Sequence, residues 1–186
     1  MCDRVKASFD TQPLELNPLP IEAWTWTCGP FPVTDKGNKY VAVMIEHFSK
    51  TIALEPLQTK EAKHTCYAFE HGVLSRYGSC AELLTDRGTE FEGEFHACMV
   101  RNFIDHRRTS ANHPHADGLA ERCVQTVKRS IRRYIEDQQT LTTWDEHLPY
   151  LQLGYNCSKQ ESSGHSPYHL LYAESLISHL RRCRYK

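Results

Sequence analysis

The chain has 186 residues, of which 40% are hydrophobic and 24% charged, which excludes an intrinsically disordered protein and predicts one domain around one core. The formal net charge of −1 excludes attraction of polyanions by the overall field of the protein, so any contact with nucleic acid must come from a local basic face. The longest apolar run is Tyr40–Ile45. It is far shorter than the roughly 20 residues of a membrane helix, so we expect no membrane association.

The N-terminal residues contain no basic segment followed by an apolar stretch, so we expect a nuclear or cytoplasmic protein that is not secreted. The eight cysteines are scattered and form no Cys-x-x-Cys pair. In a reducing compartment we expect them to be free thiols.

Alternating apolar and polar residues predict three strands joined by short turns, an antiparallel meander over 22–28, 39–47 and 51–57. Helical spacing and short apolar runs then alternate along the chain. They predict a helix over 60–77, a strand over 81–85, a helix over 91–103, a strand over 105–110, a loop over 112–118, and helices over 119–137, 144–155 and 167–172. This order predicts an α/β fold with a mixed five-stranded sheet flanked by helices.

Three segments follow from the same patterns. Residues 1–20 hold three of the nine prolines and little periodicity, which predicts a poorly ordered lead-in. Residues 21–173 form the expected domain, and residues 174–186 form a basic C-terminal tail.

Two acidic residues lie at positions where a carboxylate is costly unless it has a structural or functional role. Asp86 ends an apolar strand, and Glu121 lies one turn into the longest predicted helix. Carboxylates on a strand end and a neighbouring helix are a common way to hold Mg²⁺, and two-metal phosphoryl transfer needs several of them. The structural alternatives are a turn cap for Asp86 and a favourable helix-dipole position for Glu121.

The residues around both acids resemble a known family. Residues 84–91 read LTDRGTEF and residues 113–122 read HPHADGLAER, with 34 residues between Asp86 and Glu121. Both segments resemble motifs of the integrase catalytic cores of retroviruses and gypsy-type LTR retrotransposons. Further landmarks upstream and downstream extend the resemblance over about residues 22–173.

The resemblance implies a ribonuclease-H-like fold and DNA integration, in which water trims a 3′ end and the new hydroxyl then attacks a target phosphate. It implies an Asp, Asp, Glu triad that holds two Mg²⁺ or Mn²⁺ ions, with Asp86 second and Glu121 third. It also implies DNA, both element ends and target, as a partner, and self-association into a homo-oligomer.

The first acid of this triad is missing. Residues 24–30 read WTWTCGP, one residue shorter than the family pattern, so the acid position falls on Thr27 counted forward or on Trp26 counted back. Neither is a carboxylate, which predicts weakened metal binding and impaired catalysis. Glu46 is a candidate substitute. The alternatives are a non-enzymatic, domesticated DNA-binding or protein-interaction module, and a decayed fragment of an element.

Beyond Glu121, the predicted helix carries Gln125, Lys128 and Arg132 at spacings that share one face with it. The resemblance implies that this face contacts DNA phosphates, which position DNA without reading its sequence. The alternative is an ordinary solvated helix face.

Residues 2–6 resemble the end of the zinc-binding module that precedes the core in this family. The other three zinc ligands are absent from the sequence, and one cysteine cannot make a tetrahedral site. We therefore expect residues 1–20 to be a remnant of that module, and we expect no zinc in this chain.

Overall fold

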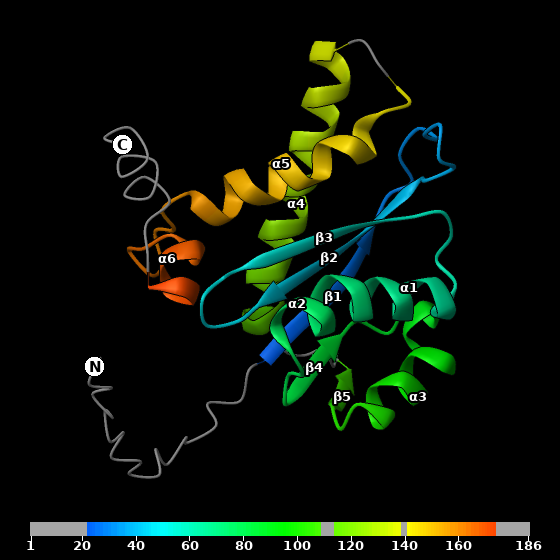
Figure 1. Ribbon diagram of the computed structural model, residues 1–186, viewed down its shortest axis with the longest axis vertical. Helices are drawn as coiled ribbons and strands as arrows, with labels where there is room; N and C mark the ends of the chain where they lie inside the picture. The colour runs from blue at the N-terminus through cyan, green and yellow to red at the C-terminus, as the bar shows by residue number, and fades with distance from the viewer. Residues whose placement is uncertain (1–21, 109–113, 139–140, 174–186) are drawn as a thin grey trace, which may run out of the picture.

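A computed structural model describes residues 22–108, 114–138 and 141–173, with only the backbone for residues 22–26 and 114–120. Five strands form one sheet in the order β3-β2-β1-β4-β5 (Figure 1). The strands are β1 (Glu22–Cys28), β2 (Tyr40–Glu46), β3 (Ile52–Leu57), β4 (Glu82–Thr85) and β5 (Asp105–Arg108). The predicted mixed five-stranded sheet is thus confirmed.

The sheet is antiparallel on one side of β1 and parallel on the other. β1 pairs antiparallel with β2, and β2 pairs antiparallel with β3, which confirms the predicted meander. β1 pairs parallel with β4, and β4 pairs parallel with β5. The central strand therefore links the two halves of the sheet.

Helices cover both faces of the sheet (Figure 1). The helices α1 (Ala62–Phe69), α2 (Ser75–Tyr77) and α3 (Glu94–Arg101) lie over one face, and α4 (Pro114–Gln138) and α5 (Trp144–Cys157) lie over the other. Alternate residues of β2 serve the two layers, since Ala42 and Met44 belong to the α1/α3 core cluster and Val41, Val43 and Ile45 to the α4/α5 cluster. The final helix is α6 (Pro167–Tyr172).

Three predicted elements differ from those observed. The helix predicted over 60–77 contains a π-helical turn, η1 (Glu70–Leu74), between α1 and α2. The helix predicted over 91–103 is a 3₁₀ turn, η2 (Thr89–Phe91), followed by α3. The loop predicted over 112–118 is wrong for residues 114–118 because α4 begins at Pro114, a residue whose fixed φ suits the first turn of a helix.

The six cysteines in the described ranges are free thiols, as predicted. No helix in these ranges is long and apolar enough to span a membrane. The predicted lead-in over 1–20, its zinc-module remnant and the predicted tail over 174–186 lie outside the described residues.

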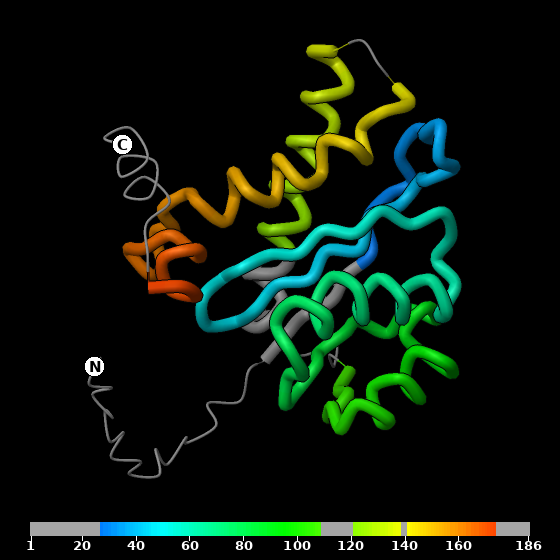
Figure 2. Tube along the Cα trace, in the orientation of Figure 1, coloured from blue at the N-terminus to red at the C-terminus, as the bar shows by residue number. Residues whose placement is uncertain are grey.

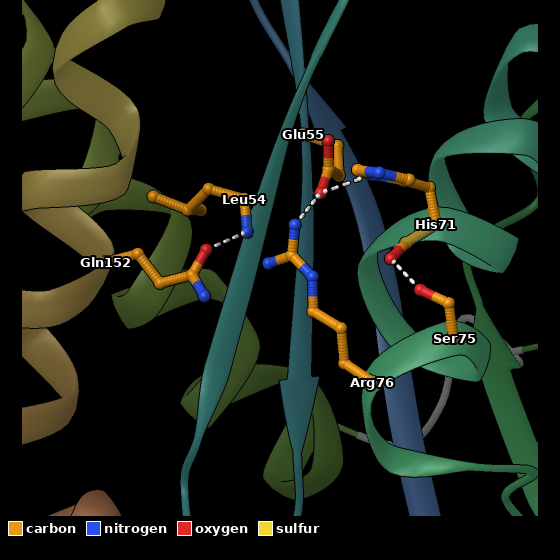
Figure 3. Close-up of polar contacts among 6 residues, drawn as sticks. All are labelled: Leu54, Glu55, His71, Ser75, Arg76 and Gln152. Carbon is orange, nitrogen blue, oxygen red and sulfur yellow. Dashed lines mark hydrogen bonds and ion pairs between the residues drawn. The ribbon is translucent and has the colours of Figure 1, made fainter.

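The outer strand of the antiparallel side is β3, whose free edge receives side chains from α5. The Asn156 amide donates to the carbonyl of Ile52 at 2.9 Å and accepts from its backbone N–H, also at 2.9 Å. The Gln152 amide oxygen accepts from the N–H of Leu54 at 2.9 Å, as Figure 3 shows. An unpaired strand edge invites pairing with another chain, so α5 both packs on the sheet and closes its edge.

The path of the chain explains how α5 reaches that edge. After α4, the chain turns and α5 runs back across α4 toward β3 (Figure 2). Trp144, at the first turn of α5, is fully buried and donates from its indole N–H to the carbonyl of Pro32 at 2.7 Å.

We expect Asn156→Ala to destabilise the protein because it leaves two buried backbone groups of Ile52 without partners. The loss should be about 1–3 kcal/mol of unfolding free energy, measured by urea denaturation. Gln152→Ala removes one partly exposed hydrogen bond and serves as the control, with a smaller loss. Equal losses in the two variants would contradict the two-sided role of Asn156.

Candidate active site at the carboxyl ends of β1 and β4

The parallel pairing of β1 with β4 brings two predicted site positions to the same edge of the sheet. The last paired residues are Thr25 and Thr85, so Trp26 and Asp86 are the next residues on the two strands. Because parallel strands run in the same direction, their carboxyl ends meet at one edge. Position 26 is therefore level with Asp86.

The pairing with β2 also separates the two candidate positions for the missing first acid. Trp26 pairs with Val43, which belongs to the α4/α5 core cluster, whereas Thr27 pairs with Ala42, which belongs to the α1/α3 cluster. Successive residues of a strand face opposite sides of a sheet. Position 26 thus lies on the face that α4 covers, and Thr27 lies on the other.

The Thr27 hydroxyl is already engaged on its own face. It donates to Oε1 of Glu90 at 2.5 Å, and the Lys60 ammonium lies 3.7 Å from the same oxygen. Glu90 is only 8% exposed. Sequence analysis did not single out this acid, although it lies inside the motif at 84–91 and directly precedes a buried phenylalanine, Phe91.

Gly88 allows two carboxylates to approach each other. Its backbone N–H donates to Oδ1 of Asp86 at 3.0 Å. A Cβ at position 88 would lie 3.0 Å from that oxygen and 2.5 Å from Oε2 of Glu90. Both acids therefore crowd the same side of Gly88, and any larger residue there would displace one of them.

A chain of hydrogen bonds from the far side of the sheet supports the backbone at Asp86. The Thr85 hydroxyl donates to the Asp86 carbonyl at 3.0 Å and lies 2.9 Å from Nε2 of His106. Since that hydroxyl proton is used, Nε2 of His106 must donate to Thr85, and its Nδ1 accepts from Nδ1 of His96 at 3.0 Å. Burial, followed by the charges of His96 and Arg108, lowers the pKa of His106 to about 4, which keeps the ring neutral.

The helix α4 approaches β1 close to the same edge. Cys28 at the end of β1 and Cys123 of α4 are both buried in the α4/α5 core cluster. Burial raises the pKa of Cys123 to about 12, a value that includes the opposing effect of a hydrogen bond with Tyr155 and a smaller rise from the nearby Cys28 thiol. Glu121 is exposed and lies two residues before this contact. That the carboxylates of Glu121 and Asp86 lie close together stays the central prediction about the site.

The predicted DNA-binding residues lie on one helix, as expected. Because α4 continues without a break from Pro114 to Gln138, Gln125, Lys128 and Arg132 share a face with Glu121. Gln125 and Arg132 are exposed and Lys128 is half-buried. Burial raises the pKa of Cys28 to about 11, and the charge of Lys128 opposes this rise.

Glu46 does not substitute for the missing acid, which corrects that sequence-based candidate. Glu46 pairs with Ala23, and Thr27 pairs with Ala42. The two levels are four positions apart on β2, about 13 Å along the strand. The Glu46 carboxylate instead accepts from the backbone N–H groups of Phe48 at 2.7 Å and Ser49 at 2.5 Å, and so holds the β2–β3 turn.

Comparison with protein families decides the relationship of the chain. The family model described as "Integrase core domain" matches residues 18–114, which contain β1, β4, Asp86 and η2. The chain belongs to the integrase core domain family. Glu121 lies beyond the matched segment.

This integrase core matches only a part of each of its relatives. The chain is 27% identical over 150 residues to the retrovirus-related Pol polyprotein from transposon 412 of Drosophila melanogaster, covering 80% of the chain and 12% of that polyprotein. It is 24% identical over 144 residues to the gypsy retrotransposon integrase-like protein 1 of Mus musculus, covering 77% of the chain and 27% of that protein. The chain thus spans well under half the length of these relatives.

Solved structures share the fold of this integrase core. The HTLV-2 integrase catalytic core domain in complex with magnesium, in its trimeric form, superposes with a TM-score of 0.65 at 19% identity, over 81% of this chain and 95% of that one. A chain of the simian T-cell lymphotropic virus intasome in complex with PP2A regulatory subunit B56 gamma superposes with a TM-score of 0.72 at 16% identity, over 84% of this chain and 56% of that one. At these identities the likeness shows the ribonuclease-H-like fold alone.

We expect the neutral His106 to make stability depend on pH. The unfolded chain binds a proton near pH 6.5 and the folded chain only near pH 4, so the unfolding free energy falls as pH drops through that window. Because the ring is partly hydrated, the loss should stay below the roughly 3 kcal/mol that the full shift would give. Urea denaturation at a series of pH values measures it.

His106→Gln, which cannot titrate, should flatten this part of the profile. His165→Gln changes an exposed histidine and is the control, with the wild-type profile retained. An unchanged pH profile in His106→Gln would show that another group is responsible.

Proposed function

We propose that this chain is a DNA-binding integrase core of retroelement origin whose strand-transfer chemistry is impaired. The proposal rests above all on one observation, namely that the β1 position level with Asp86 is a tryptophan, not a carboxylate. Asp86 and Glu121 would then be the second and third acids of a broken triad.

The residues at this edge do not fit a pair of Mg²⁺ or Mn²⁺ ions. Two-metal phosphoryl transfer needs carboxylates that bridge and neutralise both cations. Glu90 is a further acid close to Thr27, but its carboxylate accepts from Thr27 and is ion-paired to Lys60. Asp86 and Glu121 alone would hold one divalent ion weakly.

DNA binding depends on a different set of charges. Lys128 and Arg132 form no ion pair with any residue that the structure describes, whereas Arg133 is paired with Asp137 at 3.7 Å. Unpaired cations on an exposed helix face release counterions when they meet phosphates. We expect Lys128 and Arg132 to contact the DNA backbone, with Gln125 between them and Glu121.

The same observations support a second candidate, a non-enzymatic module that binds DNA with this helix face. This face has Gln125, Lys128 and Arg132 in place, whereas the first acid is absent. Binding of DNA therefore need not depend on the remaining acids. In both cases we expect self-association, because the HTLV-2 core domain that it resembles was solved in a trimeric form.

We expect Lys128→Ala and Arg132→Ala each to weaken binding to duplex DNA and to lower the slope of log K against log salt by about 1. Fluorescence anisotropy at several salt concentrations measures both effects. Arg133→Ala, which removes a paired arginine from the same helix, is the matched control and should change binding less. If all three variants bind alike, α4 does not hold the phosphates.

Asp86→Asn and Glu121→Gln extend the same measurement and distinguish the two candidates. A module that binds DNA without metal keeps its affinity in both variants. Loss of affinity in both, in the presence of Mg²⁺, would favour an integrase core that still uses a bound metal.

We expect Trp26→Asp to restore Mg²⁺-dependent joining of a donor DNA end from near zero, because position 26 is level with Asp86 on the α4 face. Thr27→Asp is the matched control. It adds the same charge one residue away on the other face, against the carboxylate of Glu90, and should restore nothing and lower stability. The readouts are joined product, Mn²⁺ affinity by calorimetry, and the melting temperature as a check on folding.

Efficient joining by the unmodified chain would show that the chemistry is intact and would contradict the impaired reading. Restoration by Thr27→Asp but not by Trp26→Asp would show that the register argument assigns the acid to the wrong position.

A further inference from the structure

Two cysteines and one acid meet away from the candidate active site, between α1 and α3. Cys66 and Glu70 are four residues apart and so face the same way on one helical segment, and Cys98 comes from α3. Their two sulfur atoms and one carboxylate oxygen all lie within 4.8 Å of one another. Cys98 donates from Sγ to Oε1 of Glu70 at 3.2 Å.

These separations are close to those of a metal-bound ligand set. Zinc takes thiolate ligands at about 2.3 Å and carboxylate oxygens at about 2.0–2.2 Å in tetrahedral geometry, which places ligand atoms roughly 3.5–4 Å apart. Small rotations of three side chains would therefore bring the atoms of this cluster around one ion. Both cysteines are buried, at 7% and 0% exposure, so they are shielded from bulk solvent.

The charges around the cluster are suited to a bound cation. Burial raises the pKa of both thiols, so each stays protonated until something displaces its proton. Arg101 lies near both and opposes this rise. Two thiolates and a carboxylate carry three negative charges, which a divalent cation and the Arg101 guanidinium would neutralise.

We propose that Cys66, Glu70 and Cys98 form a binding site for a thiophilic divalent cation of the Zn²⁺ class, with water in the fourth position. The site uses soft sulfur ligands, unlike the oxygen ligands of Asp86 and Glu121. It is independent of the proposed DNA chemistry and of Cys2, on which the expectation of no zinc was based. Metal binding here would tie α1 to α3.

This link would reach the candidate active site through the core. Cys66 and Cys98 belong to the same hydrophobic cluster as Phe91, the last residue of η2, and η2 also contains Glu90. A cation between α1 and α3 would therefore stabilise the α1/α3 core cluster, against which η2 packs through Phe91. Binding of metal to the folded chain alone raises its apparent stability.

Titration of the reduced, metal-free full chain with Cd²⁺ tests the proposal. Cd²⁺ bound to thiolates gives a near-ultraviolet charge-transfer absorbance, and the melting temperature should rise with it. The affinity should increase with pH because two thiol protons are released. In Cys98→Ser, the absorbance that comes from one tightly bound Cd²⁺ ion per chain should be lost.

Two further variants separate ligation from folding. Cys80→Ser changes another buried thiol of the same core cluster and should retain the tight equivalent. Glu70→Gln keeps the shape of a side chain at the edge of the core, and should weaken Cd²⁺ by at least the roughly tenfold that loss of even an outer-shell partner causes.

Three outcomes would overturn the proposal. The first is a tight Cd²⁺ signal that survives in Cys98→Ser, and the second is one that Cys80→Ser abolishes equally. The third is a reduced wild-type chain that takes up no more Cd²⁺ than Cys98→Ser.

Discussion

The pairing of β1 with both of its neighbours is the constraint on which the rest of the structure depends. Its antiparallel partner β2 sets which β1 residues face α4, and its parallel partner β4 sets which of them is level with Asp86. A shift of one residue would move every side chain of β1 to the opposite face. The register of β1 with its two neighbours therefore sets which of its residues lies at the edge next to Asp86.

The two faces of the sheet differ in character near the end of β1. On the α1/α3 side, Thr27, Glu90 and Lys60 form a closed set of hydrogen bond and ion pair around a buried carboxylate. A carboxylate with so little exposure needs such partners, because an unpaired buried charge is costly. These contacts hold the segment after β4 against β1. They stabilise the fold and occupy the Glu90 carboxylate with Thr27 and Lys60.

On the α4/α5 side, packing and binding are divided between two faces of one helix. Cys123, Val124, Val127 and Ile131 of α4 are buried in the core cluster that also contains Cys28. In the neighbouring stripe, Glu121, Gln125 and Arg132 are exposed and Lys128 is half-buried. A face of this kind can contact a polyanion although the whole chain carries a net charge of only −1, because the field is local.

Much of the fold and of the candidate site could be predicted from the sequence. Strand and helix periodicities are local properties, and the motifs at 84–91 and 113–122 are contiguous stretches of sequence. The meander, the five strands and the shared face of α4 all follow from such local patterns, and the structure confirms them. Only the tertiary structure decided that position 26, not Thr27, is level with Asp86, that Glu46 lies at a different level of the sheet, and that Glu90 pairs with Thr27 and Lys60. Each of these depends on the register between strands distant in the sequence, which no local pattern encodes.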